Sequence, residues 1–188
     1  MWRFRHVGMA ACLAGLMALA VSSHATARQW RATPAAKAMD YAHIIDRKSA
    51  SRTALIFWMV PEIVELTPRT MEARQILRRY AVIGVNDVAV SDLGEFRTLS
   101  APPPSIKIKN LAPLPPLKND TLPSNVVSTI QLLGDAFSKV LGKLGQGITW
   151  YVFDGQEISS CQEGRFEVSF AGVDYLYETP IPGCEWES

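Results

Sequence analysis

Seven prolines fall between residues 102 and 123, and this density constrains the fold more than any other feature of the sequence. Proline lacks a backbone N–H donor and has a fixed φ, so the segment cannot form a helix or a central strand. We expect an extended strap with polyproline-II character across a domain, or a docking segment for a partner. Ile106 and Ile108 alternate with lysines inside it, which predicts a short edge strand. The prolines are Pro102, Pro103, Pro104, Pro113, Pro115, Pro116 and Pro123.

Residues 1–27 have the three parts of a secretory signal peptide. Two arginines precede an apolar stretch, Met9–Val21, and Ala25-Thr26-Ala27 has the A-x-A pattern of a cleavage site. The apolar stretch is shorter than the ~18 residues that a membrane-spanning helix needs. We therefore expect cleavage after Ala27, a periplasmic or secreted protein, and no transmembrane span after cleavage. An uncleaved membrane anchor and a lipoprotein modified at Cys12 are the alternatives.

Removal of the signal would leave two cysteines, Cys161 and Cys184, and one histidine, His43. Two cysteines in an exported chain are expected to form a disulfide. Closing the loop between them is worth roughly 3 kcal/mol in the chain-entropy model. A reactive thiol or a cysteine–metal site is the alternative. The sequence offers it no second cysteine pair and no neighbouring histidine.

The expected domain organisation follows from shifts in composition. Residues 28–52 are rich in alanine and mixed in charge, and we expect this segment to be loose or partly helical, with a helix over 35–47. A single α+β domain would then occupy 53–188. Its first element is Thr53–Val60, a continuous apolar run whose length and aromatic content favour a strand buried on both faces.

The clearest helix is predicted over 124–144, where apolar residues recur at spacings of three and four and so share one face. These residues are Val126, Ile130, Leu133, Phe137, Val140 and Leu144. Gly134, Ser138 and Gly142 form a second stripe of small residues, which lets another backbone approach closely. We expect that stripe to pack on the protein's own sheet, and a partner helix or a membrane surface is the alternative.

The C-terminal part is predicted to be all β. Asp154-Gly155 indicates a tight hairpin, and Ala171-Gly172 indicates a second turn between two alternating segments. Earlier in the chain, Asn86-Asp87 interrupts a β-branched run and predicts another two-residue turn. The expected fold is therefore α+β: a mixed or antiparallel sheet with one long amphipathic helix, a Pro-rich strap over 102–123 and a C-terminal β-meander stapled by the disulfide.

Charge is unevenly distributed in the mature chain. Residues 28–118 carry 14 basic and 8 acidic side chains, a net +6, whereas residues 119–188 carry 3 and 10, a net −7. The two parts could attract each other, or an acidic face could bind a basic partner, or a basic face could bind lipid or polysaccharide anions. The whole chain has a net charge of only +1, so we expect no nucleic-acid partner.

The common catalytic and metal-binding arrangements are missing from the sequence. The mature chain has too few His and Cys residues for zinc, copper or haem, and no EF-hand spacing. Two acidic pairs could join at most a weak adventitious calcium site: Asp87 with Asp92, and Asp154 with Glu157. His43 is the only candidate base for a nucleophilic serine, and no Gly-x-Ser-x-Gly motif is present. No phosphate-binding or dinucleotide motif indicates a cofactor.

Paired carboxylates are the one catalytic chemistry that the sequence leaves open, because a glycosidase needs only two of them. The candidates are Glu62 with Glu65, and Glu157, Glu163, Glu167 and Glu178 in the C-terminal part. Because any chain of this size offers such pairs, we expect instead a non-enzymatic interaction module. It would bind another envelope or secreted protein, as an inhibitor, an immunity protein or an assembly accessory does. The alternatives are a small carboxylate hydrolase acting on wall or surface polysaccharide, and an envelope protein whose helix 124–144 touches lipid.

Overall fold

The computed structural model describes residues Tyr41–Arg47, Ser51–Ile181 and Cys184. The expected signal peptide and most of the segment 28–52 lie outside the described residues. The described part is α+β with antiparallel sheets, which confirms the fold class at that level. Its elements are β1 (Ala42–Arg47), β2 (Arg52–Met59), η1 (Pro61–Ile63), α2 (Met71–Arg79), β3 (Tyr80–Val90), β4 (Phe96–Leu99), β5 (Ser105–Ile108), η2 (Asn119–Thr121), α3 (Ser124–Leu141), α4 (Lys143–Gln146), β6 (Thr149–Asp154), β7 (Gly164–Phe170) and β8 (Val173–Thr179).

Two antiparallel sheets make up the β structure. In the first, which we call sheet A, the strand order is β1-β2-β3-β4, and β6 also pairs with β3. β3 is long enough to hold two neighbours on one edge: β6 pairs with residues 80–85, and β4 pairs with residues 87–90. The second, sheet B, has the order β5-β7-β8.

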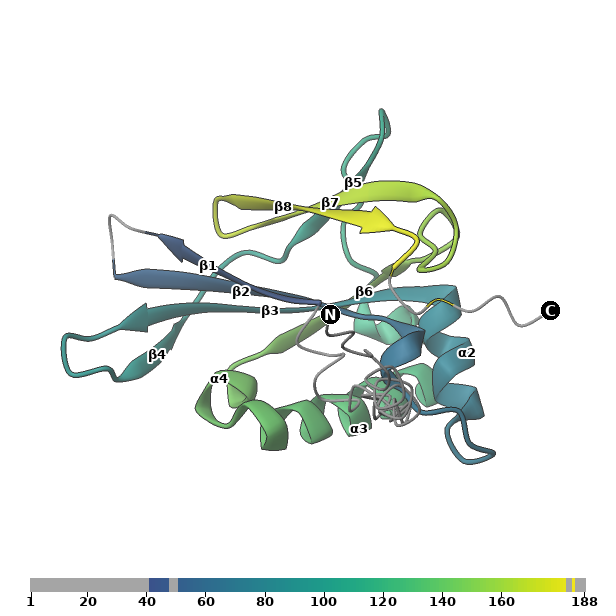
Figure 1. The fold of residues 1–188 in the computed structure, drawn as a ribbon, viewed down its shortest axis with the longest axis horizontal. Coiled ribbons are helices and arrows are strands. Elements are labelled where there is room, and N and C mark those ends of the chain that lie inside the picture. Colours follow the sequence, from purple (N-terminus) through teal and green to yellow (C-terminus); the bar gives the residue numbers. More distant parts are fainter. Residues whose placement is uncertain (1–40, 48–50, 182–183, 185–188) are drawn as a thin grey trace, which may run out of the picture. The chain divides into compact units, whose positions relative to one another are not determined.

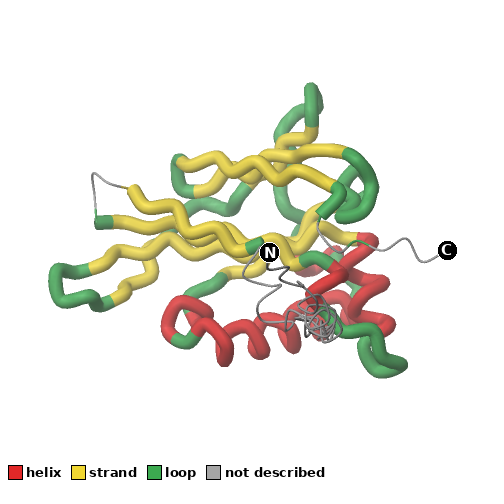
Figure 2. The backbone as a smooth tube through the Cα atoms, viewed as in Figure 1, coloured by secondary structure: helices red, strands yellow, loops and turns green. Residues whose placement is uncertain are grey.

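Sheet A is the middle of three layers. The helices lie on one of its faces and sheet B lies on the other, as Figures 1 and 2 show. On the helix side, the Phe57 ring of β2 contacts the Phe137 ring of α3, with 4.6 Å between their centroids. On the other side, the Trp58 ring contacts Phe166 of β7 at 4.8 Å. Adjacent residues of β2 thus serve both interfaces, because successive side chains of a strand point to opposite faces.

The apolar run at Thr53–Val60 forms the central buried strand that the sequence predicts. Its residues 54–60 are all buried, and β2 pairs with β1 on one edge and β3 on the other. Since both faces are covered, the strand carries apolar side chains at every position from Ala54 onward instead of an alternating pattern.

Helix α3 occupies most of the predicted range, but it ends at Leu141, followed by Gly142 with φ of 57°. Val140, expected on the buried face, is 60% exposed, so that expectation is wrong. Gly134 packs against β6: a Cβ at this position would lie 2.7 Å from Nε1 of Trp150. A small residue is therefore required here for the helix to reach the protein's own sheet.

The Pro-rich strap contains the edge strand that its alternation predicts. Ile106 and Ile108 of β5 are buried, and the lysine between them is exposed. The strap then turns back along β5, since Leu114 and Ile106 exchange two backbone hydrogen bonds of 3.1 and 2.7 Å. Farther on, the N–H of Leu117 donates to the carbonyl of Val152 in β6 at 2.7 Å. One segment thus covers the outer edges of β5 and β6.

The structure corrects the prediction of a helix over 35–47 for its described part. Residues 42–47 are β1, which pairs antiparallel with β2 from Ala42 opposite Phe57 to Arg47 opposite Arg52. The helical spacing of apolar residues in this segment is outweighed by pairing with a strongly apolar neighbouring strand. Sheet A therefore starts before residue 53.

Two predicted turns are also corrected. Asn86 and Asp87 lie inside the continuous strand β3 and are buried, with 2% and 1% of their surface exposed. The C-terminal strands do not form one meander, because β6 pairs with β3 and only β7 and β8 pair with each other. Between β6 and β7, Gly155 permits a close backbone contact instead of a hairpin: its N–H donates to the Arg79 carbonyl at 3.2 Å, and a Cβ there would lie 2.6 Å from the same oxygen.

Candidate functional site

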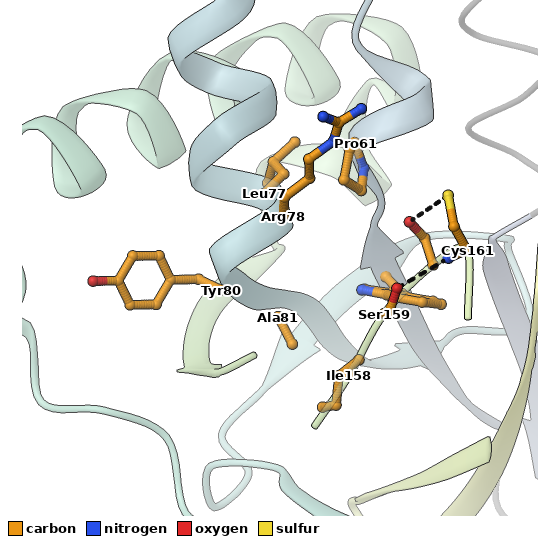
Figure 3. Close-up of a pocket in the computed structure, with 10 residues that line it drawn as sticks. Pro61, Leu77, Arg78, Tyr80, Ala81, Ile158, Ser159 and Cys161 are labelled. Atoms are coloured by element: carbon orange, nitrogen blue, oxygen red, sulfur yellow. Dashed lines mark hydrogen bonds between the residues drawn. The ribbon is translucent and has the colours of Figure 1, made fainter. Parts of the chain in front are cut away.

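A cavity of about 300 Å³ opens beside the predicted disulfide, and Figure 3 shows its lining. Its apolar wall comes from β2, α2, the start of β3 and the segment after β6, and its polar wall comes from the serines before Cys161. The lining residues are Trp58, Pro61, Leu77, Arg78, Tyr80, Ala81, Ile158, Ser159, Ser160 and Cys161. A pocket of this size and mixed lining fits an amino-acid side chain or a small ligand.

Cys161 and Cys184 are joined in a disulfide, with 5.4 Å between their Cα atoms, as the sequence predicts. The Glu62 carboxylate lies against the bridge: its Oε1 is 3.6 and 3.7 Å from the two sulfurs and accepts a hydrogen bond of 3.2 Å from the Ser160 hydroxyl. Its Oε2 is buried with no hydrogen-bond partner. The two sulfurs and Oε1 lie close enough for a metal site, but sulfurs in a disulfide are not thiolate ligands.

The two serines of the cavity are both engaged in holding the local fold. The Ser159 hydroxyl accepts the N–H groups of Cys161 and Gln162, at 3.3 and 3.2 Å, and so caps a turn. Ser160 donates to Glu62. His43 lies in β1 and is not among the residues that line the cavity. Among the described residues, the lining of this cavity holds no serine–histidine pair of the kind a serine hydrolase uses.

The candidate carboxylates are spread over the described structure. Glu62 is half-buried at the disulfide, whereas Glu65 and Glu157 are exposed. Glu163 and Glu178 line one open hollow with Lys109 and Arg165, on the outer face of sheet B. Both glutamates are exposed there, without the enclosed cleft that would hold a sugar ring between two carboxyl groups.

The first acidic pair considered for calcium combines a buried residue, Asp87, with an exposed one, Asp92. Asp87 is buried in β3, and its Oδ2 pairs with the Arg52 guanidinium, whereas Asp92 is exposed in the turn before β4. Asp154 accepts a hydrogen bond of 3.2 Å from the N–H of Gln156 and is exposed, as is Glu157. In the described part of the chain, neither pair belongs to a cluster of three or more potential metal ligands.

The second candidate site is one side of the two-sheet sandwich, which we call the open side. It consists of the outer edges of β1 and β8. Among the described residues, no strand pairs with either edge. The two edges belong to the same side because His43 of β1 stacks on Tyr175 of β8, with ring centroids 3.6 Å apart and an interplanar angle of 17°.

An aromatic cluster holds the two strands of the open side together. The His43 ring also meets the edge of Tyr177 at 5.3 Å, and the Tyr177 hydroxyl donates to the Tyr41 carbonyl at 3.3 Å. Burial raises the pKa of Tyr177 well above its ordinary value, with a smaller contribution from Tyr175. Burial also lowers the pKa of His43 from its ordinary value of 6.5.

Apolar side chains remain exposed on the outward faces of this open side. Ile44 of β1 is 58% exposed and Leu176 of β8 is 46% exposed. The opposite side, which we call the closed side, is covered by the strap at β5 and β6, and its other strand, β4, has only four residues. Sequence reasoning missed the open side because β1 was expected to be helical. The adjacent Ile44 and Ile45 give no alternating pattern in the sequence, so the strand is evident only from its pairing with β2.

Comparisons with known proteins leave the structure as the only guide to function. No protein-family model, no curated protein and no solved structure matches this chain. No helix in the described ranges has both the length and the apolar character needed to cross a membrane.

Proposed function

We propose that this chain is an exported, non-enzymatic interaction module that binds another envelope or secreted protein through its open side. Residues 1–27 would be its signal peptide, cleaved after Ala27, and the rest would fold as one α+β domain. The disulfide Cys161–Cys184 supports export, since such bonds persist in oxidising compartments. An inhibitor, an immunity protein or an assembly accessory fits this description.

The observation that carries the proposal is the contrast between covered and uncovered strand edges. A free edge presents unpaired N–H and C=O groups, and native proteins commonly cover, shorten or bend such edges. Here the strap covers β5 and β6, whereas the edges of β1 and β8 have no paired strand in the described structure. Strand addition by a partner requires a strand edge without a paired neighbour. The outer edge of β1 is of this kind, and the exposed Ile44 lies on the same strand.

The proposal is tested by cross-linking in the native envelope with two matched variants. Ile44→Lys changes a side chain 58% exposed on the open side, and Leu111→Lys changes one 50% exposed in the strap. Neither side chain is buried, so both variants should fold. We expect one partner at a fixed stoichiometry with the wild type and with Leu111→Lys, and its loss with Ile44→Lys. Equal recovery with both variants, or no partner with any chain, would overturn the proposal.

The alternative, a hydrolase acting on wall or surface polysaccharide, depends on the hollow shared by Glu163 and Glu178. It predicts that purified mature protein releases reducing ends from wall polysaccharide and that Glu163→Gln abolishes the release. The interaction module predicts no release with either protein. A second alternative, lipid contact by α3, predicts co-flotation with liposomes that Val140→Lys prevents.

A further inference from the structure

Three potential metal ligands from distant parts of the chain meet at the disulfide. The Glu62 carboxylate and the sulfurs of Cys161 and Cys184 lie within 4.8 Å of one another, and all three residues are half-buried. Oxygen Oε1 of Glu62 is 3.6 Å from the Cys161 sulfur and 3.7 Å from the Cys184 sulfur. A disulfide carries no positive charge and no proton, so it gives this carboxylate nothing to pair with.

The rest of the described protein satisfies the Glu62 carboxylate only in part. Its Oε1 accepts a hydrogen bond of 3.2 Å from the hydroxyl of Ser160, a residue that is only 7% exposed. Its Oε2 is buried and has no hydrogen-bond partner among the described residues. A buried polar atom without a partner lowers stability, so it calls for an explanation such as a bound ion. A cation held between the carboxylate and the sulfurs would supply the missing interaction.

The donor set and the distances fit zinc. Thiolates select zinc or copper(I) over magnesium and calcium, and a carboxylate oxygen is an accepted zinc ligand. Zn–S bonds of about 2.3 Å and Zn–O bonds of about 2.0–2.2 Å at a tetrahedral angle place the sulfur and the oxygen roughly 3.5 Å apart. The observed separations from Glu62 Oε1, 3.6 and 3.7 Å, are close to that value. The carboxylate therefore already lies where a third zinc ligand would lie.

Both cysteines are held in place by hydrogen bonds that do not depend on the disulfide. The N–H of the buried Ile181 donates to the Ser160 carbonyl at 2.8 Å, which ties the chain before Cys184 to the chain before Cys161. The N–H of Cys184 donates to the Ile181 carbonyl at 3.2 Å, and the N–H of Cys161 donates to the Ser159 hydroxyl at 3.3 Å. Opening the bridge should therefore leave the two sulfurs as neighbours beside the carboxylate.

We propose that the reduced form of this chain binds a zinc ion through Cys161, Cys184 and Glu62, at a site that the disulfide abolishes. A dithiol reductant would supply two electrons and two protons: the S–S bond breaks, the cysteines become thiols, and the reductant becomes a disulfide. Zinc then binds both sulfurs as thiolates, and the two thiol protons pass to water. Water completes the tetrahedron, and the cavity that Cys161 lines lies next to this position (Figure 3).

This inference goes beyond the proposed function and does not depend on it. The redox state of the compartment would decide whether Cys184 is held to Cys161 by a covalent bond or by a metal ion. The count of His and Cys residues in the sequence could not reveal the site, because its third ligand is a carboxylate about a hundred residues away in the chain.

The experiment is a metal titration of the purified mature protein, reduced under nitrogen with a phosphine that contains no thiol. Co²⁺ is the first probe, because it accepts tetrahedral sites and gives a charge-transfer absorption when thiolates bind it. We expect the reduced wild type to bind one cobalt ion per chain with this absorption, and zinc to displace it. The oxidised wild type should show no such absorption. Competition with a coloured chelator then measures the zinc affinity.

Matched variants test each ligand. Glu62→Gln keeps the size of the side chain and its acceptor for Ser160, so it should fold. We expect it to weaken zinc binding by at least about tenfold, since loss of even an outer-shell partner typically costs that much. Glu65→Gln, which changes an exposed carboxylate three residues along, should bind zinc like the wild type. The double variant Cys161→Ser, Cys184→Ser should lose the cobalt absorption.

Three results would overturn the inference: no thiolate–cobalt absorption in the reduced wild type, equal zinc affinity of the reduced and oxidised protein, or equal affinity of Glu62→Gln and Glu65→Gln. Circular dichroism follows the fold throughout the titration. A reduced chain that unfolds without metal and refolds when zinc is added would support the site, because metal binding then contributes folding free energy. A reduced chain that stays unfolded in the presence of zinc would overturn it.

Discussion

The closed side and the open side of the sandwich differ in how the edges of their outer strands are covered. On the closed side, a single Pro-rich segment pairs with β5 through Leu114 and donates one backbone hydrogen bond to β6 from Leu117. On the open side, β1 and β8 are joined to each other by His43, Tyr175 and Tyr177, but no described strand covers their edges. Within the described residues, the strap thus covers strand edges on the closed side alone, and the proposed binding by the open side depends on this difference.

The two sides also differ in what their side chains contribute to stability. The strap buries Ile106 completely, whereas the open side leaves Ile44 largely in solvent. Stability should therefore depend strongly on the closed side, and binding on the open side. The predictions below test that division, beginning with the largest expected effect.

Truncating one isoleucine on each side gives the sharpest comparison. We expect Ile106→Ala to lower the free energy of unfolding by about 2–5 kcal/mol, because it removes buried methyl and methylene groups and leaves a cavity. Ile44→Ala should change it by no more than about 0.5 kcal/mol, since most of that side chain is in water. Urea unfolding of both variants measures the difference. Similar losses of unfolding free energy in the two variants would show that both sides contribute equally to stability, which would contradict the proposed difference between them.

Removing the disulfide tests whether the end of β8 depends on a covalent tether, because Cys184 follows this open-side strand. We expect the double variant Cys161→Ser, Cys184→Ser to lose roughly 3 kcal/mol of unfolding free energy, since the unfolded chain gains loop entropy. Thermal unfolding with and without reductant provides the measurement, and reductant should leave the double variant unchanged. A wild type that is equally stable when reduced would contradict the prediction.

The hydroxyl of Tyr177 links β8 to the residue before β1, so its removal should loosen the open side selectively. Tyr177→Phe should cost about 1 kcal/mol, because the Tyr41 carbonyl keeps the Trp58 N–H donor at 3.2 Å but loses the Tyr177 hydroxyl, while the ring packing remains. Tyr175→Phe, which removes a hydroxyl from a less buried ring, should have a smaller effect. Hydrogen exchange should show faster opening at β1 than at β5 in Tyr177→Phe, and uniform acceleration would argue against a local link.

Acid should weaken the open side first, through His43. Burial lowers the pKa of this ring in the folded state, so the folded protein binds fewer protons than the unfolded chain. The stability it contributes is therefore complete above its ordinary value of 6.5 and declines as the pH falls below it. Chemical unfolding at pH 7 and pH 5 should show a small loss that His43→Gln reduces. An identical loss in His43→Gln would assign the pH dependence to other groups.

Features that depend on local sequence were predicted well. The buried strand β2 follows from its unbroken apolar run, and the edge strand β5 follows from the alternation at Ile106 and Ile108. The disulfide follows from cysteine number and an expected oxidising compartment. Each of these features follows from residue type and local pattern, and predicting it does not require knowing which distant residues it contacts.

Features that depend on distant partners were missed. Asn86 and Asp87 have the composition of a turn, yet they fit inside β3. The Asn86 amide donates to the Leu144 carbonyl at 3.0 Å, and Asp87 pairs with Arg52. These partners lie far along the chain, so no local pattern reveals them. The open side was missed for the same reason: β1 is a strand because β2 pairs with it.

The shared edge of β3 implies an order of assembly. β3 and β4 are joined by a short turn, so their pairing is local and can form within microseconds. The rest of the same edge, residues 80–85, has to wait for β6, which is reached only after the strap and α3. Contacts between residues so far apart close slowly. During that interval a strongly apolar edge is unpaired, and the folding chain is most vulnerable to aggregation at the strand that later becomes the centre of its sheet.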